Sequence, residues 1–214
     1  MGLQLVVGVL GYAGDDFTDL VRADSPVLGE LLTQAGVGPW AEPASGAGQG
    51  AEFEMWGYSG LHALRRIAVH LAADGRLPEP LGADRRASED PLLRQAYERA
   101  PSDPPGPFDH LIHHSDCEGY YLPVDFAPVI VDDRARGGYL GSSVRLLAEV
   151  GRLADALGLP EDLDPDGEEV ADAADAVEPA AEGWQRYGVE SFGCLQLMAA
   201  ARHSLATGSA LVFA

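Results

Sequence analysis

The chain of 214 residues is long enough for one domain with a sizeable core, and its 46% hydrophobic content is typical of a globular fold. It carries 34 acidic and 14 basic side chains, a formal net charge of −20, and all the basic ones are arginine. Because this charge repels a phosphate backbone, we expect no nucleic-acid partner, and a basic protein is the partner that the charge favours. Alternatively, the charge only keeps the protein soluble.

No apolar stretch reaches the roughly 18 residues that would span a bilayer, so we expect no membrane partner. The apolar run that follows Met1 is short and lacks the preceding positive charge of a signal peptide. The protein is therefore predicted to be cytoplasmic. Cys117 and Cys194 lie far apart in the chain, and in a reducing compartment both are expected to be free thiols.

The first fifty residues predict a strand, helices and a loop. Residues 3–10 form a short Val-rich apolar run, which is typical of a strand buried on both faces. Residues 16–34 have apolar side chains at helical spacing, but Pro26 interrupts the pattern, so two short helices are expected. Residues 36–50 are rich in Gly, Pro and Ala and are predicted to be a variable surface loop.

The middle of the chain contains the clearest amphipathic pattern. Residues 59–73 are predicted to be a helix with Ser59 as its N-cap. A proline-rich stretch over residues 78–107 surrounds one further helix at residues 90–99. Residues 108–114 are then expected to resume an ordered, extended segment.

The last third contains two helices and an acidic stretch. A helix is predicted over residues 142–157. Residues 153–185 hold eleven acidic side chains and no basic one, and their Ala-rich centre, residues 168–176, is either a solvated helix or a mobile acidic segment. The helix at residues 191–206 is apolar nearly all round and is therefore expected to be central, and residues 211–213 form a terminal strand.

This order of strands and helices predicts an α/β or α+β fold, with a mixed sheet and packed helices. Residues 1–214 are expected to form a single globular domain. Within it, residues 36–50 and 153–185 are expected to be variable surface.

The densest polar cluster, residues 109–121, contains three histidines, carboxylates and a thiol. If residues 109–115 form a strand, His110 and His114 point to one side and His113 to the other. Such a set suits a zinc site or a cysteine nucleophile with a histidine base. Because no second Cys or His pair exists elsewhere, we predict no metal and no cofactor. The weak metal candidates are His110, His114, Asp116 and Cys117.

The same cluster also has a structural interpretation. In it the histidines lie at a sheet edge, Asp116 caps a turn, and Cys117 is a small buried apolar residue. The glycine-bearing turn before Ser142 is a separate candidate, because its N–H groups and Arg145 one turn later could bind an anion. Ordinary helix capping by Ser142 is the alternative.

Several segments resemble a widespread bacterial family of uncharacterised proteins with a His-Ser-Asp-Cys-Glu-Gly-Tyr-Tyr-x-Pro sequence. The matching segments are Tyr58-Ser59 with Leu61-His62 and Leu64-Arg65-Arg66, residues 114–121 with Pro123 and Phe126, Leu140-Gly141-Ser142-Ser143 with Arg145-Leu146-Leu147, and Arg202-His203-Ser204. The resemblance covers most of the chain and implies no activity. It implies that Ser59, His62, Arg65, His114, Asp116 and Glu118 are the residues to consider. With the cluster and the turn, the candidate binding residues are Ser59, His62, Arg65, Arg66, His114, Ser115, Asp116, Cys117, Glu118, Tyr120, Ser142, Ser143 and Arg145.

One contact follows from the helical pattern alone. His62 and Arg65 lie beside the apolar stripe of their helix, where a half-buried charge requires a partner. Asp116 and Glu118 are the carboxylates best placed to provide it. We therefore expect His62 or Arg65 to face the turn at residues 114–119.

Three functions are compatible with these patterns. The first is a non-catalytic binding protein that neutralises a basic partner, as an acidic immunity protein neutralises a toxin. The second is a hydrolase that uses the polar side chains at residues 110–118, with or without zinc. The third is a sensor that uses the same side chains, with His62 and Arg65 as ligands to a small anionic group. The sequence does not decide whether the protein is an enzyme.

Overall fold

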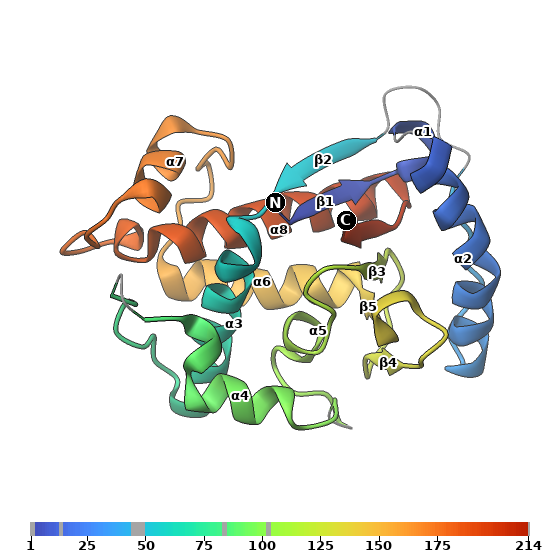
Figure 1. Cartoon of the computed structure of the whole chain (residues 1–214), viewed down its shortest axis with the longest axis horizontal. Helices are drawn as coiled ribbons and strands as arrows, with labels where there is room; N and C mark the ends of the chain where they lie inside the picture. The colour runs from blue at the N-terminus through green and yellow to red at the C-terminus, as the bar shows by residue number, and fades with distance from the viewer. Residues whose placement is uncertain (1–2, 13–14, 44–49, 83–84, 102–103, 214) are drawn as a thin grey trace.

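A mixed sheet of six strands forms the centre of the computed structural model, which describes residues 3–12, 15–43, 50–82, 85–101 and 104–213 (Figure 1). In chain order the strands are β1 (Gln4–Val7), β2 (Ala51–Glu54), β3 (Gly119–Leu122), β4 (Ile130–Val131), β5 (Tyr139–Ser142) and β6 (Leu211–Phe213). They are ordered β2-β1-β6-β3-β5-β4. Only β3 and β5 pair in parallel, and the other neighbours are antiparallel.

Helices cover both faces of this sheet. The α-helices are α1 (Val9–Tyr12), α2 (Asp15–Gln34), α3 (Gly57–Asp74), α4 (Pro91–Tyr97), α5 (Asp109–Ile112), α6 (Ser143–Leu157), α7 (Glu168–Asp175) and α8 (Gly188–Thr207). Short 3-10 turns are η1 (Ala87–Glu89), η2 (Arg136–Gly138) and η3 (Trp184–Tyr187). Helices α3, α5, α6 and α8 pack on one face and α2 on the other. The predicted fold, one domain with a mixed sheet and packed helices, is confirmed.

The two faces of the sheet belong to two different cores. Leu5 and Val7 of β1 point into the core beneath α3, α6 and α8, whereas Val6 between them points toward α2. In β6, Phe213 points into the core beneath α3, α6 and α8, and Val212 points toward α2. Since successive side chains of a strand point to opposite faces, a strand covered on both sides must be apolar throughout. This explains the continuous apolar run near the N-terminus.

Two predictions for the N-terminal segment were wrong in detail. The strand ends at Val7, because Gly8 has a positive φ of 71° and the chain turns into α1. Helix α2 continues through Pro26 instead of dividing into two. Leu28 and Leu32, which follow the proline, pack in the same core as Val21, which precedes it. This burial outweighs the backbone hydrogen bond that a proline cannot donate.

Most predictions for the later helices are confirmed. Helix α8 has buried residues from Gly188 to Ser204, and α6 begins after Ser142, whose hydroxyl accepts the Arg145 N–H at 3.3 Å. The cap proposed for Ser59 was wrong. Helix α3 already begins at Gly57, and the Ser59 hydroxyl donates to the Trp56 carbonyl at 3.2 Å.

The described part of the predicted loop over residues 36–50 has no regular structure, and residues 44–49 lie outside the described ranges. Two contacts attach it to the end of the chain. Trp40 Nε1 donates to the Gly208 carbonyl at 3.0 Å, and Glu42 Oε2 accepts the Ala210 N–H at 2.8 Å. In the ranges that the structure describes, no helix is long and apolar enough to cross a membrane.

Candidate functional site

The acidic segment, residues 153–185, lies at one end of the molecule, around α7 (Figure 1). All of its carboxylates are exposed: Asp155, Glu161, Asp162, Asp164, Asp166, Glu168, Glu169, Asp172, Asp175, Glu178 and Glu182. None of them forms an ion pair with a residue that the structure describes. Their charge is therefore available to a partner.

A small core of its own holds this segment against α8. Val170 of α7 and Trp184 of η3 are 0% and 6% exposed, and they pack with Leu163 and Leu195. The side-chain amide of Gln196 also donates to the Pro165 carbonyl at 3.1 Å. Of the two alternatives that the sequence left open, the helical one is observed over Glu168–Asp175. The carboxylates therefore project from a packed scaffold.

Helix α7 separates its apolar and acidic residues. At 100° per residue, Glu168, Glu169, Asp172 and Asp175 fall within an arc of about 120°, and Val170 lies outside that arc. Residues three apart on a helix rise by about 4.5 Å along the axis. The result is a row of carboxylates along the outer face of α7.

In several other regions of the surface, arginines neutralise carboxylates. Arg136 Nε contacts Asp24 Oδ2 at 2.9 Å, and its Nη1 lies 3.6 Å from Glu118 Oε2. Arg134 Nε lies 2.9 Å from Asp132 Oδ1, and Arg145 contacts Asp125. The acidic segment differs from these regions because it contains no arginine.

The predicted contact between α3 and the turn at residues 114–119 is confirmed. The guanidinium of Arg65 donates to Asp116 Oδ1, to the Leu111 carbonyl at 2.7 Å and to the His114 carbonyl at 2.8 Å. His62 Nε2 lies 3.3 Å from Asp116 Oδ2. We call these residues, with Tyr97, the Arg65 cluster.

The Arg65 cluster is compensated internally. The Arg65 side chain is 1% exposed and the Asp116 side chain 42% exposed. His62 Nδ1 is 2.8 Å from the Tyr97 hydroxyl, so both of its ring nitrogens have protein partners. A cavity of about 310 Å³ adjoins Arg65, Tyr97 and Asp116. Because each guanidinium nitrogen already has a partner, this arrangement favours a role in folding over capture of an anionic ligand.

The prediction of an extended segment at residues 108–114 was wrong, because Asp109–Ile112 form the helical turn α5. The reason lies in Glu149 of α6, a buried side chain that no local pattern connects to this segment. Its Oε1 and Oε2 accept the N–H groups of His110 and Leu111 at 3.1 and 2.7 Å, which caps the turn. Burial raises the pKa of Glu149 to about 8.

His110 and His114 are buried inside the domain and do not lie at a sheet edge. His110 Nδ1 accepts the Ser142 N–H at 3.0 Å, and the His114 ring stacks on Tyr121 with centroids 4.0 Å apart. Burial lowers the pKa of His110 to about 4 and that of His114 to about 3. Both rings are therefore neutral at physiological pH.

Cys117 is exposed, so its interpretation as a buried apolar residue was wrong. Its sulfur is 3.8 Å from the Ser115 hydroxyl. The nitrogens of the neighbouring His114 ring contact the carbonyls of Ser115 and Tyr120. Within the described ranges no histidine pairs with this thiol, and no group of three or more His, Cys, Asp or Glu could hold a metal ion. Among these described residues, Cys117 therefore has no histidine base of the kind that the hydrolase hypothesis requires.

The remaining candidate residues lie apart from the Arg65 cluster and make structural contacts. Arg66 Nε contacts Asp90 at 3.1 Å, and the Tyr120 hydroxyl donates to Asp24 at 2.6 Å. The Ser143 hydroxyl is 2.8 Å from that of Ser204. Ser142 and Arg145 serve as a helix cap and a surface ion-pair partner, and Ser59 lines a separate groove.

That groove is the feature that sequence analysis missed. It has a volume of about 630 Å³ and lies between α3, residues 80–81 and 85–88, α7 and the start of α8. Trp56, Val177 and Glu190 are among its lining residues. These three positions come from distant parts of the chain, and no local motif connects them.

A family model described as "Putative DNA-mimic protein" matches residues 1–213. No curated protein and no solved structure matches the chain.

This match corrects the expectation that nucleic acid plays no part in the protein's interactions. The negative charge of the protein disfavours a surface that binds phosphates. It is compatible with the converse case, a surface that resembles phosphates.

Proposed function

Because the chain belongs to the family described as "Putative DNA-mimic protein", we propose that it is a non-catalytic binding protein that imitates the charge of DNA. Its partner is a protein with a basic, DNA-contacting surface. The acidic segment is the part that contacts this partner, and its carboxylates occupy the places of backbone phosphates.

The single observation that carries the proposal is the set of eleven exposed carboxylates without ion pairs, held on a packed scaffold. Duplex DNA presents one negative charge per roughly 1.7 Å of its axis, or about 3.4 Å along each strand. The carboxylates along α7 follow one another at a rise of the same order. A basic surface that is spaced for phosphates would therefore find acceptors at compatible intervals.

Preorganisation supports this proposal over simple solubility. A charge that only maintains solubility can be spread over any flexible surface. Here Val170 and Trp184 fix the segment against α8, so little ordering entropy would be lost on binding. Occupation of the partner's basic surface would exclude DNA from it. An immunity-like role toward a basic toxin is one form of the same activity.

The test is displacement of DNA from a captured partner. Immobilised protein first selects binding proteins from an extract at low salt, and a labelled 20-base-pair duplex is then bound to the isolated partner. The free protein is expected to displace the duplex, and the effect should weaken as salt rises. If none of the captured DNA-binding partners released its duplex, the proposal would be contradicted.

Two charge-matched variants locate the surface. The segment variant combines Glu161→Gln, Asp162→Asn, Glu168→Gln, Glu169→Gln and Asp172→Asn. The control variant makes five such changes at exposed carboxylates elsewhere, namely Glu52→Gln, Glu54→Gln, Asp74→Asn, Glu98→Gln and Asp133→Asn. Both lose five negative charges, but only the segment variant is expected to lose displacement. Equal loss in both would show that net charge alone is responsible.

A further inference from the structure

The groove between α3, α7 and the start of α8 adjoins the acidic segment directly. One of its walls is formed by Ala173, Ala174, Ala176, Val177 and Pro179. These residues alternate in the sequence with carboxylates of the segment, in the order Asp-Ala-Ala-Asp-Ala-Val-Glu-Pro over residues 172–179. Asp175 and Glu178 flank the exposed part of this wall, so a molecule that contacts these two carboxylates would also reach the groove.

Apolar side chains that the fold leaves uncovered surround this mouth. Val177 is 80% exposed, the largest fraction among the large hydrophobic side chains that the structure describes. Trp56 lines the groove from the N-terminal end of α3 and is only partly buried. Exposed apolar surface rimmed by charge is typical of a protein interaction site.

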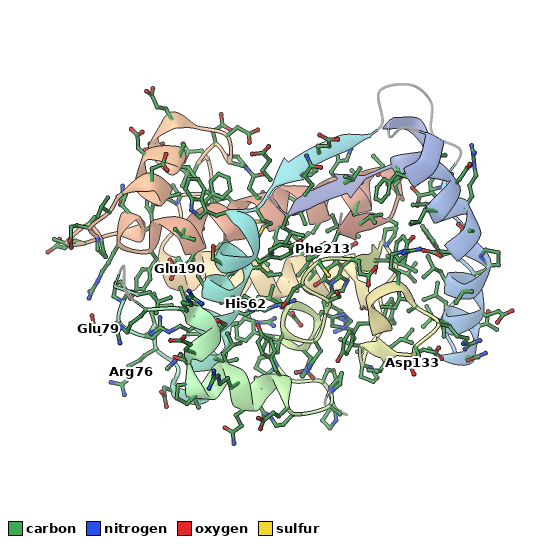
Figure 2. All side chains as sticks on the ribbon, viewed as in Figure 1. His62, Arg76, Glu79, Asp133, Glu190 and Phe213 are labelled. Atoms are coloured by element: carbon green, nitrogen blue, oxygen red, sulfur yellow. The ribbon has the colours of Figure 1, made fainter. Side chains whose placement is uncertain are left out.

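The polar groups in the groove limit what can occupy it. Arg85, Arg86 and Arg186 also line the groove and disfavour a cationic side chain inside it. Glu190, at the start of α8, is 6% exposed and forms no ion pair with a described residue (Figure 2). It offers a hydrogen-bond acceptor or, when protonated, a donor to a backbone group of the occupant. The occupant that fits is an apolar side chain on a backbone segment.

We propose that this groove anchors an apolar side chain of the basic partner, next to the basic residues that contact the acidic segment. The inference rests on the proposed function and adds a source of specificity. Charge alone attracts any cationic surface, whereas an apolar pocket selects a partner with a side chain at the matching position. The phosphate backbone of DNA offers no such pocket. The groove would therefore let the partner distinguish this protein from DNA.

Two synthetic peptides separate the anchor from the charge. Both have twelve residues and six arginines, one with a central Leu-Phe-Leu and the other with Ser-Asn-Ser. Affinities are measured by calorimetry at low and at physiological salt. We expect the apolar peptide to bind about tenfold more tightly, because burial of one such side chain accounts for a factor of this size.

Two variants test where the apolar peptide binds. Ala176→Trp places a large side chain at an exposed position of the groove wall, and Ala206→Trp places it at an exposed position of α8 that does not line the groove. We expect Ala176→Trp to remove the preference for the apolar peptide while binding of the polar peptide is retained. Ala206→Trp should retain both.

The outcomes distinguish the two proposals. Equal affinity of the two peptides for the unmodified protein, or a preference that survives Ala176→Trp, would overturn the anchor and leave the DNA-mimic function in place. Binding of neither peptide at low salt would contradict the proposed function itself.

Discussion

The Arg65 cluster and the acidic segment use charged residues in opposite ways. In the Arg65 cluster a buried guanidinium is bound by Asp116 and by two backbone carbonyls. In the acidic segment eleven carboxylates are exposed and form no ion pair with any residue in the described ranges. In the Arg65 cluster the charges are compensated within the fold. In the acidic segment they are uncompensated and can attract another molecule.

The difference shows why residue type alone is a poor guide to a site. Asp116 lies in the segment richest in potential catalytic groups, yet its hydrogen bonds connect α3 to the turn that precedes β3. Asp172 lies in a sequence of low complexity, yet it is on the outer face of an anchored helix. The surroundings of each carboxylate determine its role.

The largest effect is expected from Arg65→Met, which removes the centre of the Arg65 cluster. It leaves the carbonyls of Leu111 and His114 without their buried donor, so the free energy of unfolding should fall by about 3–5 kcal/mol. Urea denaturation measures this change. Asp116→Asn should cost less, because the Asp116 side chain is 42% exposed. If Arg65→Met kept full stability but abolished binding, the cluster would be a site and the comparison would fail.

A smaller effect concerns His114 and pH. Its pKa is lowered from 6.5 to about 3 by burial, so the unfolded chain binds more protons than the folded one between these values. Stability should therefore fall as pH drops below 6.5. In His114→Phe this contribution is absent, and the loss between pH 7 and pH 4 should be smaller by about 2–3 kcal/mol. Parallel stability curves for the two proteins would show that the ring is not buried as described.

Val170→Ala tests the scaffold of the acidic segment. It removes two methyl groups from a fully buried side chain between α7 and α8, which should cost about 2 kcal/mol. Hydrogen exchange is expected to speed up mainly in α7. Exchange that rises equally in α3 would mean that the segment is not a separately anchored unit.

The smallest effect on stability is expected from the segment variant described above. Its five carboxylates form no ion pairs in the described residues, so their neutralisation should change the free energy of unfolding by less than about 0.5 kcal/mol. Relief of mutual repulsion should make any change favourable at low salt. A large destabilisation would mean that these carboxylates stabilise the folded protein, which would contradict their assignment to an interface.

The sequence was informative where local pattern and packing agree. The apolar character of α8 predicted its central position, and the half-buried charges on α3 predicted the contact between Arg65 and Asp116. Prediction failed where a distant residue decides the local structure. Glu149 caps the helical turn at Asp109–Ile112, and the core beneath α2 carries that helix through Pro26.

The charge of the acidic segment is evident from its residues, but its arrangement in space is not. Neither the exposure of every carboxylate nor the anchoring of α7 by Val170 and Trp184 follows from composition. The groove beside the segment combines Trp56, Val177 and Glu190 from three separate parts of the chain. Such a site depends on the tertiary arrangement and has no local signature.

The most direct test of the central claim is the association rate with the captured partner. Reversal of three exposed carboxylates, Asp162→Arg, Glu168→Arg and Glu169→Arg, should reduce the rate constant by about tenfold or more at low salt and affect dissociation less. The difference should shrink as added salt screens the surface. An association rate equal to that of the unmodified protein at low salt would contradict the claim that the acidic segment meets the partner.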